Sequence, residues 1–277
     1  MNRTLQRETE LLRRSWQRQN TRQISQYLIR NVEDPRVNLN SILSRHFLIS
    51  EIFGPNIRLM RKEIVFGIRM TRLMLDLDEK DPGDSFHGVI NIFQRKWRSE
   101  LAGSGAEKVS VLEPACGSAA DYRCMDSFGM APHMEYTGFD LCSSNISNAK
   151  RMFPSVTFET GNVLDMKYAD KSFDYCVVHD LFEHLSREAI SAAVSEICRV
   201  TRKKIFIGFF NMRLYGDHQI KRMYDTHYNL LSARKLVQAF RQHGAEARIR
   251  GLNRLVTEQY HSEPHYNKDA YYGIFIL

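Results

Sequence analysis

The chain has 277 residues, of which 43% are hydrophobic, and a formal net charge of +7. This length is enough for a sizeable core and for one large domain with an appendage. No apolar run is long enough to cross a bilayer, and residues 1–14 lack the apolar core of a signal peptide, so we expect a cytoplasmic protein.

The first part of the chain carries most of the excess positive charge. Residues 1–80 hold 15 Lys and Arg against 9 Asp and Glu. Apolar residues recur there at helical spacing, at Leu5, Leu12, Trp16, Ile24 and Leu28. We therefore predict an all-helical cap or dimerisation region over residues 1–82, ended by the linker DEKDPGDS. We interpret its Arg-rich first helix as amphipathic, with a solvated polar face opposite an apolar stripe. The alternative is a surface that binds nucleic acid or an anionic membrane, although few aromatic residues interleave with the arginines.

A strand, a tight turn, a helix and a second strand are predicted between Val109 and Asp140. The apolar run VSVL leads to Glu113 and to a turn around Gly117, where small residues let a ligand approach the backbone. The second strand, MEYTGFDL, places Asp140 beside that turn in a parallel sheet. An acid at this point suits the hydroxyls of a ribose, so the stretch indicates a nucleotide-like cofactor.

The charge of this turn disfavours a dinucleotide. The dinucleotide fingerprint needs three glycines, and only Gly117 is present. Glu113 would repel a pyrophosphate, whereas it could accept a hydrogen bond from the ammonium group of a cofactor that contains an amino acid.

The segment EPACGSA resembles the first motif of the class I S-adenosylmethionine (SAM) methyltransferases of the type 11-like group, with Ala115 and Ala119 in place of two glycines. Downstream, VTFETGNVLDM is similar to the family's third strand and adenine-binding turn, with Asn162 where Asp is usual, and DKSFDYCVVHDLFEHL is similar to its fourth strand. The resemblance implies a SAM-dependent domain over residues 83–277. Its fold would be an α/β Rossmann-like seven-stranded sheet with an antiparallel last strand.

The remaining elements follow in the same order. EAISAAVSEICRV predicts a helix and KIFIGFF a fifth strand, with TRKK where the family has a Lys-Pro-Gly-Gly turn. LLSARKLVQAFRQHGAEARIRGL predicts an amphipathic helix, a glycine cap at Gly244 and a sixth strand. AYYGIFIL predicts the final strand.

The resemblance and the ends of the predicted strands together give a cofactor-binding set. Asp140 would bind the ribose, the turn would lie under the methionine moiety, and the Val163 amide would donate to adenine. The predicted cofactor-binding residues are Glu113, Ala115, Gly117, Asp140, Leu141, Asn162, Val163 and His179.

Histidines are the candidate bases, because His titrates near neutral pH. His179 and His184 follow the fourth strand, and His218 and His227 lie in the polar insert after the fifth, together with Tyr224 and Tyr228. His184 could instead have a structural role in holding the turn, and Asp180 could cap the short helix that follows it. The insert could be a solvated loop. A base is needed only when the acceptor must lose a proton.

Cysteine and histidine spacing gives no metal site. The five cysteines form no CxxC pair, so we expect reduced structural thiols. His261 and His265 are four residues apart, but Pro264 interrupts the helix that would place them on one face.

Three functions remain open. The first is methylation of a small-molecule acceptor, most simply at a hydroxyl, by a protein that could form a homodimer through its N-terminal helices. The second is an RNA-directed methyltransferase. The chain lacks an NPPY or DPPY tetrapeptide after the fourth strand and a PC dipeptide, which argues against this function. The third is a non-catalytic SAM-fold binding protein, suggested by the lost glycines but opposed by Glu113, Gly117 and Asp140 together.

Overall fold

The computed structural model describes residues 2–14, 51, 108–127, 130–209, 211–223, 226–254, 257–258 and 268–277. Most of the predicted helical cap, including its linker, therefore lies outside the described residues. None of the described helices is long and apolar enough to span a membrane.

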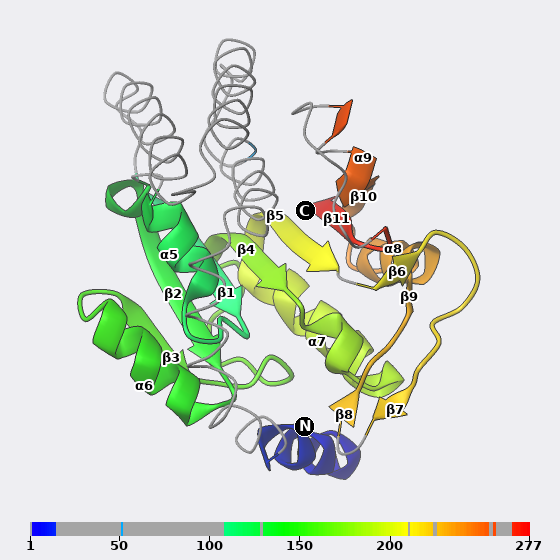
Figure 1. Cartoon of the computed structure of the whole chain (residues 1–277), viewed down its shortest axis with the longest axis horizontal. Helices are drawn as coiled ribbons and strands as arrows, with labels where there is room; N and C mark the ends of the chain where they lie inside the picture. Colours follow the sequence, from blue (N-terminus) through cyan, green and yellow to red (C-terminus); the bar gives the residue numbers. More distant parts are fainter. Residues whose placement is uncertain are drawn as a thin grey trace, which may run out of the picture.

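A single seven-stranded sheet organises the domain, in the order β10-β11-β5-β4-β1-β2-β3 (Figure 1). Only β11 runs against its neighbours, because it pairs antiparallel with both β5 and β10. This topology confirms the predicted fold class. The strands are β1 (Val109–Pro114), β2 (Met134–Asp140), β3 (Thr157–Thr160), β4 (Phe173–His179), β5 (Thr201–Phe209), β10 (Glu246–Gly251) and β11 (Tyr271–Ile276).

Two layers of helices cover the sheet, because neighbouring strand residues point to opposite faces. Val111 belongs to a core cluster with residues of α5 (Ala120–Ser127) and α6 (Ser143–Met152). Leu112 belongs to a second cluster with residues of α7 (Arg187–Val200) and α8 (Ala233–Arg241). The short elements are η1 (Ala131–His133), η2 (Phe182–His184), β6 (Met212–Arg213), β7 (Arg222–Met223), β8 (Thr226–His227), β9 (Leu231–Ser232) and α9 (Leu252–Arg254).

The fifth strand begins earlier than predicted. Helix α7 ends at Val200 and β5 starts at Thr201, so TRKK forms the start of the strand rather than a turn. The buried Thr201 hydroxyl donates to the carbonyl of Ile197 at 2.7 Å, which satisfies a carbonyl at the end of the helix. The helix can therefore pass directly into the strand without glycine.

The end of α8 and the polar insert are held by local hydrogen bonds. Gly244 has φ 82°, and the amide of Ala245 donates to the carbonyl of Phe240, so the predicted glycine cap is confirmed. The insert forms short strand pairs, β6 with β9 and β7 with β8, rather than a plain loop. Buried Asn229 fastens it to the turn after β4, because its side-chain amide donates to the Leu185 carbonyl at 2.6 Å.

The N-terminal helix, residues 3–14, lies along the edge of the sheet where β3 and β4 end (Figure 1). Leu5 and Leu12 are buried in the second core cluster. The Glu8 carboxylate accepts hydrogen bonds from the Ser186 amide, at 2.7 Å, and from the Ser186 hydroxyl at the start of α7. An acid at a helix N-terminus is favourable, since the unpaired amides there carry partial positive charge.

Candidate functional site

The turn after β1 has an alternating backbone conformation. Ala115, Gly117 and Ala119 have φ of 57°, 53° and 64°, in the left-handed region that favours glycine. The two alanines each cost about 1 kcal/mol in this conformation. The amide of Cys116 donates to the Phe139 carbonyl at 3.0 Å and that of Ala119 to the Cys116 carbonyl at 2.9 Å. The turn thus keeps the shape of a glycine-rich loop with only one glycine.

Asp140 ties this turn to the start of α6. Its Oδ2 accepts from the Gly117 amide at 3.0 Å, and its Oδ1 accepts from the Cys142 amide at 2.7 Å and from the side chain of Asn145 at 3.2 Å. The carboxylate is 9% exposed. Burial raises the pKa of Asp140, while the three hydrogen bonds act in the opposite direction.

Open space adjoins Gly117 on its side-chain side. A Cβ built on Gly117 would meet no described atom within 4 Å. Gly138 differs, because a Cβ there would lie 2.9 Å from the Phe158 ring and its glycine is needed for packing. The space beside Gly117 and Asp140 is therefore where a ligand could lie against the backbone of the turn.

The Glu113 side chain is buried against the sheet. It is 3% exposed, and it accepts a hydrogen bond from the hydroxyl of Tyr136 on β2. Burial, together with the nearby Glu113 carboxylate, raises the pKa of Tyr136 well above its usual value, so the hydroxyl keeps its proton. Sequence reasoning did not single out Tyr136; its position on the strand beside Glu113 is the only sequence signal.

The predicted adenine turn follows β3. Asn162 Oδ1 accepts from the Leu164 amide at 3.0 Å, and its Nδ2 donates to Thr9 Oγ1 of the N-terminal helix at 3.2 Å. Val163 is 8% exposed, and in the part of the chain that the structure describes its amide has no hydrogen-bond acceptor. Leu141, directly after Asp140, is half-buried. This turn therefore offers a donor at one end of the site.

His179 ends β4, the strand beside β1. Its Nδ1 contacts the carboxylate of Asp121, in the first turn of α5, and its ring centroid lies 5.8 Å from that of Tyr272. Gly208 makes room for the ring, since a Cβ there would lie 2.2 Å from His179 Cδ2. Sequence reasoning missed Asp121, because the pairing depends on how α5 packs on the sheet.

The other three histidines do not gather around His179. His184 Nδ1 faces the His227 carbonyl at 3.1 Å, so these two lie together, and burial lowers the pKa of His184. His218 Nδ1 accepts from the Ser232 amide at 3.0 Å, and burial lowers its pKa to about 4. His218 is therefore neutral near pH 7, with Nδ1 engaged in the fold. The cap position of η2 is Leu181, without a side-chain bond, rather than Asp180.

The described residues contain no group of three or more His, Cys, Asp and Glu side chains placed to hold a metal. His261 and His265 lie outside them, as do Tyr224 and the side chain of Cys124. The other four cysteines are buried and form no disulfide bond within the part of the chain that the structure describes: Cys116, Cys142, Cys176 and Cys198.

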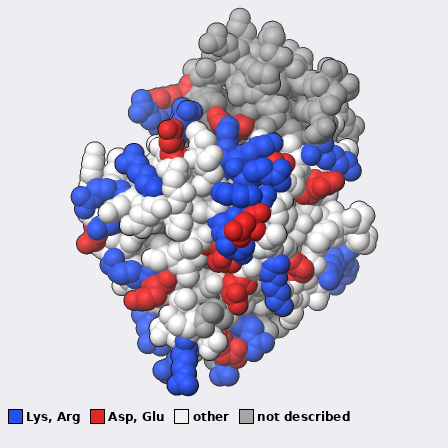
Figure 2. All heavy atoms as spheres, turned by 180° about the vertical axis from the view of Figure 1, so that it is seen from behind, with Lys and Arg blue, Asp and Glu red and all other residues white. Residues whose placement is uncertain are grey.

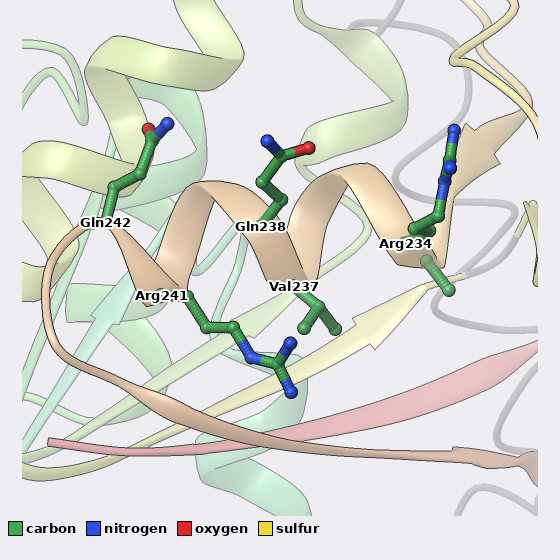
Figure 3. A pocket seen from close by; sticks show the side chains of 6 residues that line it. Arg234, Val237, Gln238, Arg241 and Gln242 are labelled. Atoms are coloured by element: carbon green, nitrogen blue, oxygen red, sulfur yellow. The ribbon is translucent and has the colours of Figure 1, made fainter.

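A shallow depression on the surface of α8 is separate from this site (Figure 3). All of its lining residues lie on that helix or directly after it, and none comes from the ends of β1, β2 or β4. They are Ala233, Arg234, Val237, Gln238, Arg241 and Gln242.

Residues 111–204 match the model of the methyltransferase domain family. The fold resembles a SAM-dependent methyltransferase from Methanosarcina mazei (15% identity, 64% of this chain and 94% of that chain covered, TM-score 0.46). It also resembles the 1,6-didemethyltoxoflavin-N1-methyltransferase of Burkholderia thailandensis, solved with its substrate and S-adenosylhomocysteine (14% identity, 79% and 87% covered, TM-score 0.47). A putative methyltransferase of Haloferax volcanii, solved with the Trm112 activator, is 13% identical (68% and 92% covered, TM-score 0.46). The search of curated proteins gave no match.

The family match shows that the chain carries a methyltransferase domain. It also indicates S-adenosylmethionine as the cofactor, in agreement with the resemblance of the first motif.

Proposed function

We propose that this chain, which carries a methyltransferase domain over residues 111–204, transfers the methyl group of SAM to a hydroxyl of a small-molecule acceptor. The observation that supports this most strongly is the turn after β1. Its alternating left-handed residues are tied to Asp140 and leave open space beside Gly117.

The residues around that space fit the parts of SAM. A carboxylate has about four acceptor positions, and Asp140 uses three of them on the protein, so a ribose hydroxyl can still donate to it. The turn from Glu113 to Ala119 would lie under the methionine moiety. The Val163 amide would donate to an adenine ring nitrogen, beside Asn162.

Methyl transfer from SAM requires few groups on the protein. The bound cofactor supplies a methyl group on a sulfonium that is already activated. The protein must therefore hold the acceptor in line and exclude water, and it must accept a proton if the acceptor is a hydroxyl. Of the four candidate histidines, His179 is placed best for this, because it ends the strand beside the turn.

The RNA-directed alternative has less support. On the face seen in Figure 2, Lys and Arg side chains lie among Asp, Glu and uncharged residues rather than forming an unbroken basic surface. The non-catalytic alternative drew on the lost glycines, and its basis is weaker because Ala115 and Ala119 adopt the conformation that glycine would have. Four buried cysteines that form no disulfide bond with another described residue suit the reducing cytoplasm that we expect for the chain.

A methyl-acceptor screen tests the proposal. The full chain is incubated with SAM and with separate panels of phenols, alcohols, amines, thiols and RNA, and S-adenosylhomocysteine is measured together with the methylated product. We expect a methyl ether from one class of hydroxyl compound. Methylation of RNA alone, or of amines or thiols alone, would overturn the acceptor assignment.

We expect the N-terminal helix to act as a cover for the site. Deleting the first thirty residues should reduce acceptor methylation more than it reduces folding of the sheet, because Glu8 and Thr9 contact the segments that follow β4 and β3. Glu8→Ala should lower acceptor methylation less than the deletion does, and it should cost about 1 kcal/mol of stability. Turnover and thermal unfolding are measured for both.

Glu10→Ala is the matched control, because Glu10 lies on the same helix and its ion-pair partners among the described residues are the exposed Arg13 and Arg14. Turnover that is unchanged by the deletion would rule out a covering role.

A further inference from the structure

We propose that Asp121 is the positioning residue of the site: it holds the imidazole of His179 in the tautomer that leaves Nε2 free to take a proton from the acceptor. This inference rests on the proposed function and narrows the acceptor to molecules that must lose a proton on methylation.

The contact between the two side chains is well shielded. Asp121 keeps 4% of its side-chain surface exposed and His179 keeps 16%. The carboxylate meets the ring at Nδ1. An ionised carboxylate can only accept, so Nδ1 must carry the hydrogen; a neutral imidazole has one such hydrogen, and Nε2 is therefore left with a lone pair.

Three elements fix the ring in this orientation. Asp121 reaches it from α5, the ring of Tyr272 lies beside it from β11, and Gly208 of β5 provides the space for its Cδ2–Nε2 edge. A side chain at position 208 would occupy that edge, since Nε2 lies 3.0 Å from the place of a Cβ there. Within the described part of the chain, Nε2 has no hydrogen-bond partner. The ring is therefore held at one nitrogen and available at the other.

Methyl transfer to a hydroxyl would be accompanied by proton transfer to His179. The hydroxyl proton of the acceptor passes to Nε2 of His179, and the oxygen's electron pair forms the new bond to the methyl carbon. The electron pair of the breaking carbon–sulfur bond stays on sulfur, which becomes a neutral thioether. The imidazolium then releases its proton to water, with Asp121 having kept its charge throughout.

The test reads the tautomer directly and needs neither SAM nor an acceptor. The full chain is labelled with ¹⁵N-histidine, and the His179 signals are identified by their loss in His179→Gln. We expect the neutral ring to carry its hydrogen on Nδ1. In Asp121→Asn we expect the preference for this tautomer to be lost, because an amide side chain can either donate to Nδ1 or accept from it.

Asp126→Asn is the matched control, since Asp126 is exposed on the same helix and its replacement should leave the His179 tautomer unchanged. If Asp121→Asn does not fold, Asp121→Glu, which keeps the charge, should retain the wild-type tautomer.

A hydrogen on Nε2 in the wild type, or an unchanged tautomer in folded Asp121→Asn, would overturn the proposal without bearing on whether the chain transfers methyl groups. Conversely, a chain that shows the expected tautomer but methylates no hydroxyl compound would overturn the proposed function. With a hydroxyl acceptor, Asp121→Asn should lower kcat by about 100-fold and leave the Kd for S-adenosylhomocysteine within about twofold.

Discussion

Replacing His179 with alanine is expected to lower the turnover of a hydroxyl acceptor by about 100-fold or more, with little change in SAM affinity. The physical reason is the loss of the only candidate base that ends a central strand next to the cofactor turn. Once an acceptor is known, kcat and the Kd for SAM are measured for the variant and the wild type at several pH values.

The other histidines provide the comparison. His218→Ala should mainly affect stability, since His218 Nδ1 is engaged by the Ser232 amide. His184→Ala should loosen the insert, because His184 Nδ1 is hydrogen-bonded to the backbone carbonyl of His227. His227→Ala keeps that carbonyl and should have the smaller effect. If all four variants keep near-normal rates, catalysis rests on positioning alone, and an amine or thiol acceptor becomes the better explanation.

Replacing Asp140 with alanine is expected to weaken SAM binding by about 1.5 to 3 kcal/mol, through loss of a charge-assisted hydrogen bond to the ribose. The structure adds a second effect. The variant leaves the Gly117 amide, the Cys142 amide and the Asn145 side chain without their acceptor, so the free energy of unfolding should fall as well.

Calorimetry with SAM and chemical denaturation separate the two effects. Asp165→Ala serves as the control, because Asp165 is an exposed acid in the turn after Asn162. An Asp140→Ala protein that is folded and binds SAM as tightly as the wild type would show that the ribose anchor is assigned to the wrong residue.

The fold could be predicted from the sequence because its signals are local. The apolar run before Glu113, the helix spacing before Val200 and the glycine after α8 each act within one element. The antiparallel last strand came from the family resemblance instead. The start of β5 was misplaced because TRKK is polar, whereas its strand conformation depends on pairing with β4 and β11.

The site was predictable only in part. The turn and Asp140 follow from their positions at strand ends, which the sequence order determines. The side-chain partners within the site could not be predicted in this way. Asp121 and His179 are 58 positions apart in the sequence, and Tyr136 and Glu113 are 23 apart. The contacts of Thr9 and Glu8 likewise join distant segments. Such pairs depend on tertiary packing, which a single sequence does not reveal.

Calorimetry of two glycine variants tests most directly whether SAM lies against the turn at Gly117. Gly117 and Gly244 share a left-handed φ, and a Cβ on either would meet no described atom within 4 Å. Gly117→Ala and Gly244→Ala should therefore lose similar stability, about 1 kcal/mol each. We expect the wild type to bind SAM and S-adenosylhomocysteine but not NAD, and we expect Gly244→Ala to bind them as the wild type does. Gly117→Ala should bind both compounds at least about tenfold more weakly, because its methyl group enters the space of the ligand. A wild type that binds neither compound, or a Gly117→Ala protein that binds both as tightly as Gly244→Ala does, would show that SAM does not lie against this turn.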